Sequence, residues 1–415
     1  MARLFQVKLC ILGLLLSMQT TFAKTIIVEP NNPEKTLKKA FELASDGDTI
    51  LIKEGLYCEG SLILNKSVTL VGENFPVIDG ENKYEILVIE HDNVIVKNIT
   101  FSNSGSSSFK DIAALKIKNS NHVIIENCKF NNNFFGIHTI NSNYVSYLKN
   151  ELISGQIAGK PSANGIHIWK SKHLTIEDNS IHGHRDAIYL EFVEKSKINN
   201  NKCIENKRYG LHFMFSHDNV FTKNIFDKNE AGVAVMYSKR VEMIENVFKK
   251  SWGGAAYGVL LKEIDDSKII RNVFTENTIG IYGDGANRVE IFENKFLKNG
   301  WALKINASSA DIVISKNNFL GNTFDIATNG KLKVKSLNQN YWDKYEGYDL
   351  DKNGLGDVPY HPLSLFSVLV ERNESAMLLY RSFMITLLDK SERVLPSITP
   401  DYLKDESPLM QPLKL

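Results

Sequence analysis

The chain has 415 residues, of which 23% are charged, and its formal net charge is +1. A balance this close to neutral argues against the basic footprint of a nucleic-acid-binding protein. The length suits two or three ordinary domains or a single repetitive solenoid.

Residues 1–23 have the composition of a secretory signal. Arg3 and Lys8 form a basic start, and the apolar stretch at 9–18 is about half the ~20 residues that a membrane-spanning helix needs. Small residues precede a cut after Ala23, and loss of the two basic residues takes the net charge from +1 to −1. We therefore expect export in soluble form. The remaining cysteines, Cys58, Cys128 and Cys203, are scattered and odd in number, which argues against a disulfide framework.

The first elements after the signal resemble a solenoid start. Residues 37–44 form an amphipathic pattern that predicts a short helix, and residues 49–52, 61–64 and 68–71 read as strands. Such a helix can cover the open end of a first coil, which would otherwise expose apolar surface.

An asparagine recurs near the end of each β-rich stretch, with steps of mostly 22 or 23 residues. Its positions are Asn98, Asn127, Asn150, Asn179, Asn201, Asn224, Asn246, Asn272, Asn294 and Asn317. Three longer steps contain Gly/Ser-rich insertions at 104–108, 155–163 and 251–256. We interpret the column as a structural ladder in which each asparagine bonds its neighbours above and below.

A small residue opens one strand of each coil and keeps pace with the asparagines. Its positions are Gly136, Gly165, Ala187, Gly210, Gly232, Gly258, Gly280 and Ala302. Coils of about 22 residues with short alternating strands predict an all-β fold, a right-handed parallel β-helix.

Counting from the small residue separates core from surface, because strand side chains alternate. Positions +1 and +3 are mostly apolar and face inward, so +2 and +4 face outward. Position +2 reads His138, His167, Tyr189, His212, Ala234, Leu260, Tyr282 and Lys304. Position +4 reads Ile140, Trp169, Glu191, Met214, Met236, Lys262, Asp284 and Asn306.

Histidine and methionine gather on this outward face. His212 and Met214 share one strand, Met214 stacks on Met236 in the next coil, and His138 stacks on His167. Imidazole and thioether ligands together favour copper, especially Cu(I), so the candidate copper ligands are His212, Met214 and Met236, with His138 and His167 as a second group. Two alternatives remain open: ordinary exposed side chains, or a protein-binding patch that includes Trp169, Tyr189, Phe215 and Met236.

A polar loop follows the solenoid. Asp349, Asp351, Asn353 and Asp357 have the 1, 3, 5, 9 spacing of a calcium loop, with Gly354 at the turn. Position 12 is Tyr360 instead of the usual glutamate, so calcium binding and a rigid Asx/Gly turn are both possible readings.

After Pro362 the periodicity becomes helical, over 363–371 and about 374–394. The stretch 375–388 has one charged residue and is apolar nearly all round, so it needs burial, yet it is too short to span a bilayer. A cap on the last coil needs only one apolar face, so we expect a partner for the rest, such as a membrane protein. The expected contacts are Leu378, Leu379, Phe383 and Leu387 in the tail, with Trp169 on the outward face.

Parallel β-helices often act on acidic polysaccharides, which requires clustered carboxylates. Here Glu191 and Asp284 are four coils apart, about 19 Å at ~4.8 Å per coil, beyond the ~5–10 Å of carboxylate-pair chemistry. The cluster His184-Arg185-Asp186 is interpreted as a structural turn. We therefore expect no enzyme.

Several segments resemble one family closely. The run 208–216 (RYGLHFMFS), residues 235–238 (VMYS), residues 256–262 (AYGVLLK) and the tail segments 362–371, 381–383, 392–396 and 408–410 resemble the NosD family of nitrous-oxide-reductase maturation proteins. The resemblance covers essentially the whole chain after residue 23. The His-Phe-Met strand and the tail are its most specific parts.

The resemblance implies a periplasmic subunit of an ABC-type complex with an integral membrane subunit and a cytoplasmic ATPase. Such complexes supply copper for the copper sites of nitrous oxide reductase, so a copper donor protein and the reductase become expected partners, with no nucleic acid. It also gives the tail a role, docking to the membrane subunit. We expect a signal at 1–23, a β-helix at 24–345, a polar loop at 346–361 and a docking tail at 362–415. A metal-free docking scaffold is the alternative.

Overall fold

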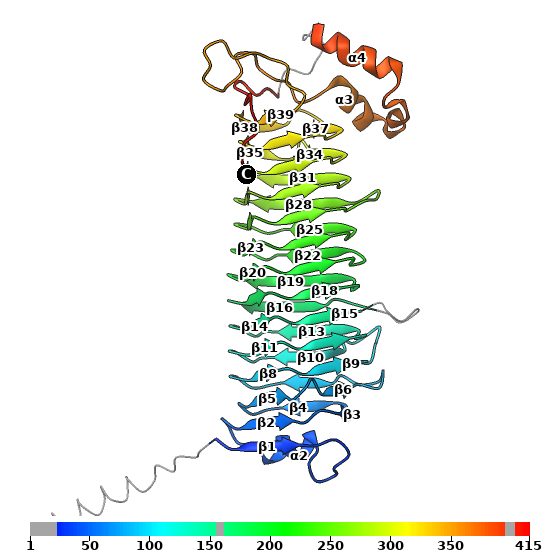
Figure 1. Cartoon of the computed structure of the whole chain (residues 1–415), viewed down its shortest axis with the longest axis vertical. Helices are drawn as coiled ribbons and strands as arrows, with labels where there is room; N and C mark the ends of the chain where they lie inside the picture. The colour runs from blue at the N-terminus through cyan, green and yellow to red at the C-terminus, as the bar shows by residue number, and fades with distance from the viewer. Residues whose placement is uncertain (1–22, 155–161, 395–402) are drawn as a thin grey trace, which may run out of the picture.

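The computed structural model describes residues 23–154, 162–394 and 403–415, and they form one column of parallel coils (Figure 1). β1 pairs in parallel with β2, and from β2 onward strands pair in parallel with the strand three places further along, so the strands stack into three faces. The parallel β-helix is thereby confirmed.

The first face consists of β1 (Thr25–Val28), β2 (Thr49–Ile52), β5 (Thr69–Gly72), β8 (Ile95–Lys97), β11 (Ile124–Glu126), β14 (Ser146–Leu148), β17 (Thr175–Glu177), β20 (Lys197–Asn199), β23 (Val220–Thr222), β26 (Glu242–Ile244), β29 (Lys268–Ile270), β32 (Glu290–Phe292), β35 (Ala310–Ser315) and β38 (Lys333–Asn338). The second face has the longest strands, and we call it the long-strand face. It consists of β4 (Leu62–Leu64), β7 (Leu87–Ile89), β10 (Ala113–Lys118), β13 (Phe135–Ile140), β16 (Ile166–Lys172), β19 (Asp186–Glu194), β22 (Tyr209–Met214), β25 (Ala231–Met236), β28 (Tyr257–Asp265), β31 (Ile279–Asn287), β34 (Trp301–Ile305) and β37 (Phe324–Ala327). The third face consists of β3 (Leu56–Tyr57), β6 (Val77–Asp79), β9 (Thr100–Ser102), β12 (Lys129–Asn131), β15 (Glu151–Ile153), β18 (Ser180–His182), β21 (Lys202–Ile204), β24 (Ile225–Asp227), β27 (Val247–Lys249), β30 (Val273–Thr275), β33 (Lys295–Leu297), β36 (Asn318–Leu320) and β39 (Tyr341–Trp342).

Helix α2 (Leu37–Leu43) covers the first coil, as expected (Figure 1). Its buried residues Leu37, Ala40 and Phe41 join the core. Both helix ends are satisfied by side chains from other coils: Glu59 accepts from the first backbone N–H groups, and Lys66 donates to the last carbonyls.

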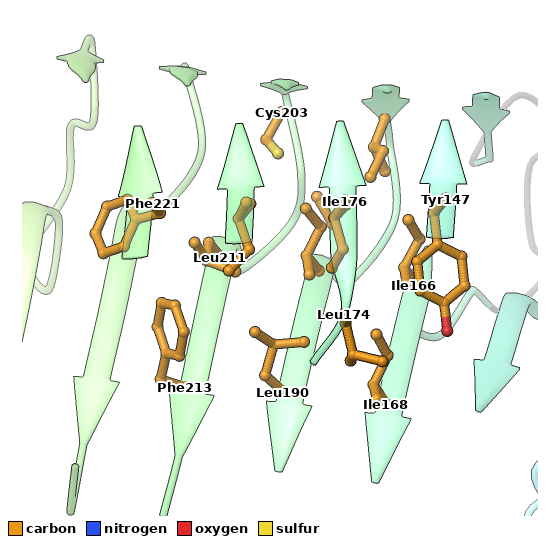
Figure 2. Close-up of a cluster of buried hydrophobic side chains, with 14 of the residues drawn as sticks. Tyr147, Ile166, Ile168, Leu174, Ile176, Leu190, Cys203, Leu211, Phe213 and Phe221 are labelled. Atoms are coloured by element: carbon orange, nitrogen blue, oxygen red, sulfur yellow. The ribbon is translucent and has the colours of Figure 1, made fainter. Parts of the chain in front are cut away.

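The core is a stack of similar apolar layers, because equivalent inward positions recur in every coil. Figure 2 shows such residues converging from the three faces, among them Leu190, Cys203 and Phe221. Toward the C-terminal end one column becomes wholly aromatic, and its ring centroids lie 4.2–5.2 Å apart. That column is Phe226, Phe248, Phe274, Phe296, Phe319 and Trp342.

The asparagine ladder is present from Asn150 onward. Each Oδ1 accepts from the backbone N–H of the preceding ladder residue, as Asn246 Oδ1 does from Asn224 at 2.9 Å, and side-chain amides link neighbouring coils. The assignment of Asn98 and Asn127 to this column was wrong by one residue, because Cys128 occupies the ladder position and donates its backbone N–H to Asn150, although Asn127 Nδ2 does donate to Asn98 Oδ1 in the preceding coil at 2.8 Å. Asn98 and Asn127 stand one residue earlier, at φ 56° and 52°. Asparagine tolerates this left-handed backbone better than most residues, which explains its recurrence there.

The small residue that opens each long strand is explained by close packing of coils. A Cβ added to Gly232 would lie 2.5 Å from the carbonyl oxygen of Gly258 in the next coil. The backbone therefore approaches its neighbour too closely for most side chains.

The tail folds onto the far end of the long-strand face. Helix α3 (Leu365–Arg372) packs Phe366 against Phe324, with ring centroids 5.7 Å apart. In place of one helix over 374–394, the chain forms a 3-10 turn, η1 (Glu374–Leu379), and helix α4 (Phe383–Val394), separated by Arg381 at φ 63°. Residues 403–415 return to the last coils, where Leu403 is buried and Leu413 bonds Asn318.

Candidate functional site

The outward columns of the long-strand face have the register that the sequence predicts. His138 pairs with His167, His167 with Tyr189, and Tyr189 with His212. Met214 pairs with Met236 in the same register. The candidate ligands of the His212 group therefore lie on two adjacent strands, β22 and β25.

The rings of the +2 column form a continuous stack. Centroid distances are 4.7 Å from His138 to His167, 4.8 Å from His167 to Tyr189 and 4.6 Å from Tyr189 to His212. The spacing follows from the parallel register, since adjacent strands are separated by about 4.8 Å.

Alternation along the strands predicts that these histidines are exposed, and the structure differs. His138 and His212 are each only 4% exposed, although they point out of the β-helix. The cover comes partly from a further outward column, one residue before the small marker, which includes Phe135 and Tyr209. Phe135 stacks on His138, and Tyr209 meets His212 edge-on at 4.8 Å. The sequence signal for this column is an aromatic residue directly before three of the six marker glycines, in Phe135-Gly136, Tyr209-Gly210 and Tyr257-Gly258.

Burial keeps the first two histidines neutral. Desolvation lowers the pKa of His138 to about 4. Desolvation and the neighbouring His138 lower the pKa of His167 to about 3. Among the described residues, Nδ1 of His138 and both ring nitrogens of His167 lack a hydrogen-bond partner. Neutral imidazoles without partners are unusual inside proteins and suit a metal or another ligand.

His212 has a different environment. Its Nδ1 lies 3.4 Å from Asp186 Oδ2 and 3.4 Å from Arg208 Nη2, while Nε2 is buried without a partner among the described residues. Asp186 is fully buried and forms a bidentate ion pair with Arg208. Burial raises the pKa of Asp186, but hydrogen bonds from His212 and Arg208 outweigh it, so the net pKa is lowered. Asp186 therefore belongs to β19 and to this site, not to a structural turn.

Next to the methionines lies an exposed aromatic stack. Met214 and Met236 are half-buried, and one position further along the same turns Phe192, Phe215 and Tyr237 stack with centroids 5.3 and 5.0 Å apart. Each of the three is about 40% exposed, at 43%, 41% and 38%. Trp169 is half-buried and is covered by Lys170, whose Nζ lies 4.2 Å from the ring centre.

The donor set at His212 fits a soft metal better than a hard one. Within the described part of the chain, no group of three or more His, Cys, Asp or Glu side chains could hold a metal ion, so a site here needs the thioethers. Burial raises the pKa of Cys128 to about 12 and also raises that of Cys203, which keeps both as thiols in the core. Imidazole and thioether donors are those that Cu(I) prefers.

The polar loop is stabilised by hydrogen bonds from its backbone N–H groups to its own Asp and Asn side chains. Asp349 accepts from the N–H groups of Asn353 and Gly354, and Asp357 accepts from Leu350. Asn353 Oδ1 accepts from Leu355, and Asp351 accepts from Asn353. These bonds are those of an Asx/Gly turn, and calcium binding stays a prediction.

The tail residues expected to bind a partner are exposed. Leu378 is 89% exposed and Phe383 is 81% exposed, while Leu379 and Leu387 are half exposed. The chain thus buries only part of the apolar tail, chiefly Phe366, Val370 and Ile385. Across the described ranges, no helix is long and apolar enough to cross a membrane.

The carboxylates that would be needed for polysaccharide chemistry stay apart. Glu191, Met214, Met236, Lys262 and Asp284 follow one another in register, so four coils separate Glu191 from Asp284. Asp284 is also engaged by Ser308 at 2.7 Å.

Comparison with known proteins finds similarity to one family over part of the chain. Residues 148–350 match the model of the family described as "Periplasmic copper-binding protein (NosD)". Two curated relatives, from Pseudomonas aeruginosa and Stutzerimonas stutzeri, are both named "Probable ABC transporter binding protein NosD". The first is 32% identical over 112 residues, 26% of this chain and 26% of the relative. The second is 31% identical over 117 residues, 28% of this chain and 27% of the relative. The chain therefore matches about a quarter of the length of these relatives.

Solved structures share the architecture. The catalytic domain of a GH87 alpha-1,3-glucanase in complex with tetrasaccharides superposes with a TM-score of 0.56 at 11% identity, over 77% of this chain and 69% of that one. At this identity the likeness shows the β-helix alone.

Proposed function

We propose, from the match of residues 148–350 to the NosD family model, that the protein is a periplasmic, copper-handling subunit of an ABC-type transporter complex. Its cargo is copper destined for the copper sites of nitrous oxide reductase. It receives the ion from a donor protein and does not catalyse a reaction of its own. Residues 1–23, which lie almost entirely outside the described part, supply the export signal in this proposal.

One observation carries the proposal: the pairing of Met214 with Met236 beside His212, whose Nε2 is buried and has no partner among the described residues. An imidazole nitrogen and two thioether sulfurs on adjacent strands provide the soft donors that Cu(I) prefers. His138 and His167, neutral at pH 7, supply further nitrogen donors on the same column.

The tail supports the proposed membrane partner. Leu378 and Phe383 expose apolar surface to solvent. Exposed apolar surface of this kind is typical of a site that a partner covers. An integral membrane subunit, itself bound to a cytoplasmic ATPase, is the partner that would bury it. The protein would then be membrane-associated through that subunit.

A docking scaffold that never touches metal is the second candidate. The exposed stack of Phe192, Phe215 and Tyr237 favours it, because a solvent-facing aromatic ladder is suited to protein contacts. Both candidates predict binding at this face, and only the first predicts metal.

An anaerobic Cu(I) titration distinguishes them. The purified protein is compared with a triple variant, His212→Ala, Met214→Ala and Met236→Ala. The matched control is Phe192→Ala, Phe215→Ala and Tyr237→Ala, which alters three neighbouring side chains of the same face without removing a donor. Circular dichroism checks that all three proteins keep the β-helix.

We expect tight Cu(I) binding that the first variant loses and the control keeps. Loss in both variants would point to damage of the face rather than of a metal site. No binding beyond background in the unaltered protein would leave the scaffold as the function.

A further inference from the structure

We propose that Asp186, held in place by Arg208, is the positioning residue that orients His212 and leaves its Nε2 free to take the metal. The inference rests on the proposed copper function. Asp186 contacts Nδ1 of His212 and thereby decides which imidazole nitrogen is left for the metal.

Three neighbouring residues build the arrangement. Asp186 is the first residue of β19, and it pairs with Tyr209, the first residue of β22 in the next coil. Arg208 directly precedes Tyr209, and His212 lies further along the same strand. Arg208 Nε donates to Asp186 Oδ1 at 2.8 Å, and Arg208 Nη2 donates to Oδ2. His212 Nδ1 faces the same Oδ2 at 3.4 Å. The carboxylate is fully buried, so water does not compete for it.

Two tautomers of His212 are possible, and the surroundings favour one. If Nδ1 carries the proton, it donates to the buried carboxylate in a charge-assisted bond. If Nδ1 is unprotonated, it can accept only from Arg208 Nη2 at 3.4 Å, and that group already donates to Asp186 Oδ2. If Nε2 carries the proton, that buried N–H has no acceptor among the described residues. Buried N–H groups without acceptors are rarer in proteins than buried acceptors without donors. His212 therefore holds its proton on Nδ1 and presents a lone pair at Nε2.

The ring is also fixed in orientation. Tyr189 lies 4.6 Å from it on one side, and Tyr209 meets it edge-on at 4.8 Å. Metal-binding histidines almost always donate their other ring N–H to a carboxylate, carbonyl or water, which fixes tautomer and direction. His167, whose two ring nitrogens both lack partners in the described chain, has no such support. This contrast separates His212 from His167.

The first test needs no copper. Protein labelled with 15N-histidine is studied by NMR without metal, and His212 is assigned from the signal lost in His212→Gln. We expect an unprotonated Nε2 in the unaltered protein. In Asp186→Asn the amide can donate to Nδ1, so the proton should move to Nε2, as a carboxylate-to-amide change does at other histidines. A proton on Nε2 in the unaltered protein would overturn the inference.

The second test measures Cu(I) affinity by competition with a chelator. Asp186→Asn should weaken binding about 10–100-fold, the usual effect of removing such a partner. The matched control is Asp218→Asn, which removes another bidentate aspartate–arginine pair, with Arg240, away from His212. It should leave both affinity and tautomer unchanged.

The outcomes separate this inference from the proposed function. Unchanged affinity in a folded Asp186→Asn variant, with binding in the unaltered protein, would overturn the role of Asp186 and keep the copper function. No Cu(I) binding in the unaltered protein would remove the copper function and the metal role of Asp186 together. If Asp186→Asn does not fold, the tautomer of His212 in the unaltered protein still tests the inference, because a proton on Nε2 would overturn it.

Discussion

Asp405 and Asn340 are 65 positions apart in the chain, yet the Asp405 carboxylate accepts both the backbone N–H and the side-chain amide of Asn340, at 3.0 and 3.2 Å. It also accepts from the indole of Trp342 at 3.0 Å. A further coil would offer an asparagine Oδ1 at this place, so the returning C-terminal segment ends the ladder with a carboxylate. In the last coil, the Asp405 carboxylate thus takes the place of the asparagine side chain that a further coil would supply.

Removing this closure should loosen the C-terminal end. Asp405→Ala leaves several buried donors of Asn340 and Trp342 without acceptors, and each such loss costs roughly 1–3 kcal/mol. We expect amide hydrogen exchange to accelerate by at least tenfold around 338–342, with little change before residue 250, since solenoid coils depend on their neighbours. Asp405→Asn keeps an oxygen acceptor and should be much milder. Equal effects of the two substitutions would contradict this account.

Two stacked phenylalanines should respond very differently to truncation. Phe274 is fully buried between Phe248 and Phe296, at 4.7 and 4.9 Å, so Phe274→Ala should cost about 3–5 kcal/mol in unfolding free energy. Phe215 has similar stacking but is 41% exposed, so Phe215→Ala should cost less than about 1 kcal/mol. Urea unfolding of the two variants measures the difference, and similar costs would show that stacking, not burial, sets the stability.

The buried histidine His184 should make the protein sensitive to acid. Burial lowers its pKa to about 3 in the folded protein, against 6.5 when unfolded. The unfolded chain therefore binds a proton as pH falls below 6.5 and the folded chain does not, so the stabilisation present above 6.5 is lost toward pH 3. The loss is about 1.4 kcal/mol per pH unit, or about 2 kcal/mol at pH 5.

The variant His184→Asn isolates this effect. His184 occupies the place in its coil that Asn206 and Asn229 occupy in the next two, since its N–H bonds Asn206 Oδ1. The difference in unfolding free energy between pH 7 and pH 5 should shrink by about 2 kcal/mol in the variant. An unchanged difference would mean that His184 does not titrate as its burial implies.

The exposed tail should be required for membrane association but not for folding. Leu378→Ser, Phe383→Ser and Leu387→Ser together remove exposed apolar surface. We expect at least a tenfold fall in the share of protein recovered with cell membranes, and an unchanged unfolding transition. The matched control changes two leucines and a phenylalanine exposed elsewhere, Leu43, Leu56 and Phe109, to serine. Loss of recovery in the control as well would argue against a specific tail contact.

Much of the fold could be predicted because the solenoid repeats its chemistry. A period of about 22 residues fixes the register, and alternation then separates inward from outward positions, as for Ile137 and His138. The error at Asn98 and Asn127 arose because two structural needs, ladder bonding and left-handed backbone, both select asparagine. The break in the tail at Arg381 had no such periodic signal.

The site was only partly predictable. Strand register placed Met214 over Met236 and His138 over His167, because it depends on spacing alone. The burial of His212 was not foreseen, since it depends on Tyr189 and Tyr209 in neighbouring positions. Asp186 was assigned to a turn because its partner Arg208 lies one full coil away in the sequence.

The parallel register also fixes distances along the +2 column of the long-strand face. Five coil steps separate His212 from Ala327, through Ala234, Leu260, Tyr282 and Lys304. At ~4.8 Å per step the height between the histidine and the coil that carries α3 is about 24 Å. Insertion or deletion of whole coils can change this height only in increments of one step. The proposed copper site on this face therefore lies at a fixed height from the surface that the tail is proposed to contact.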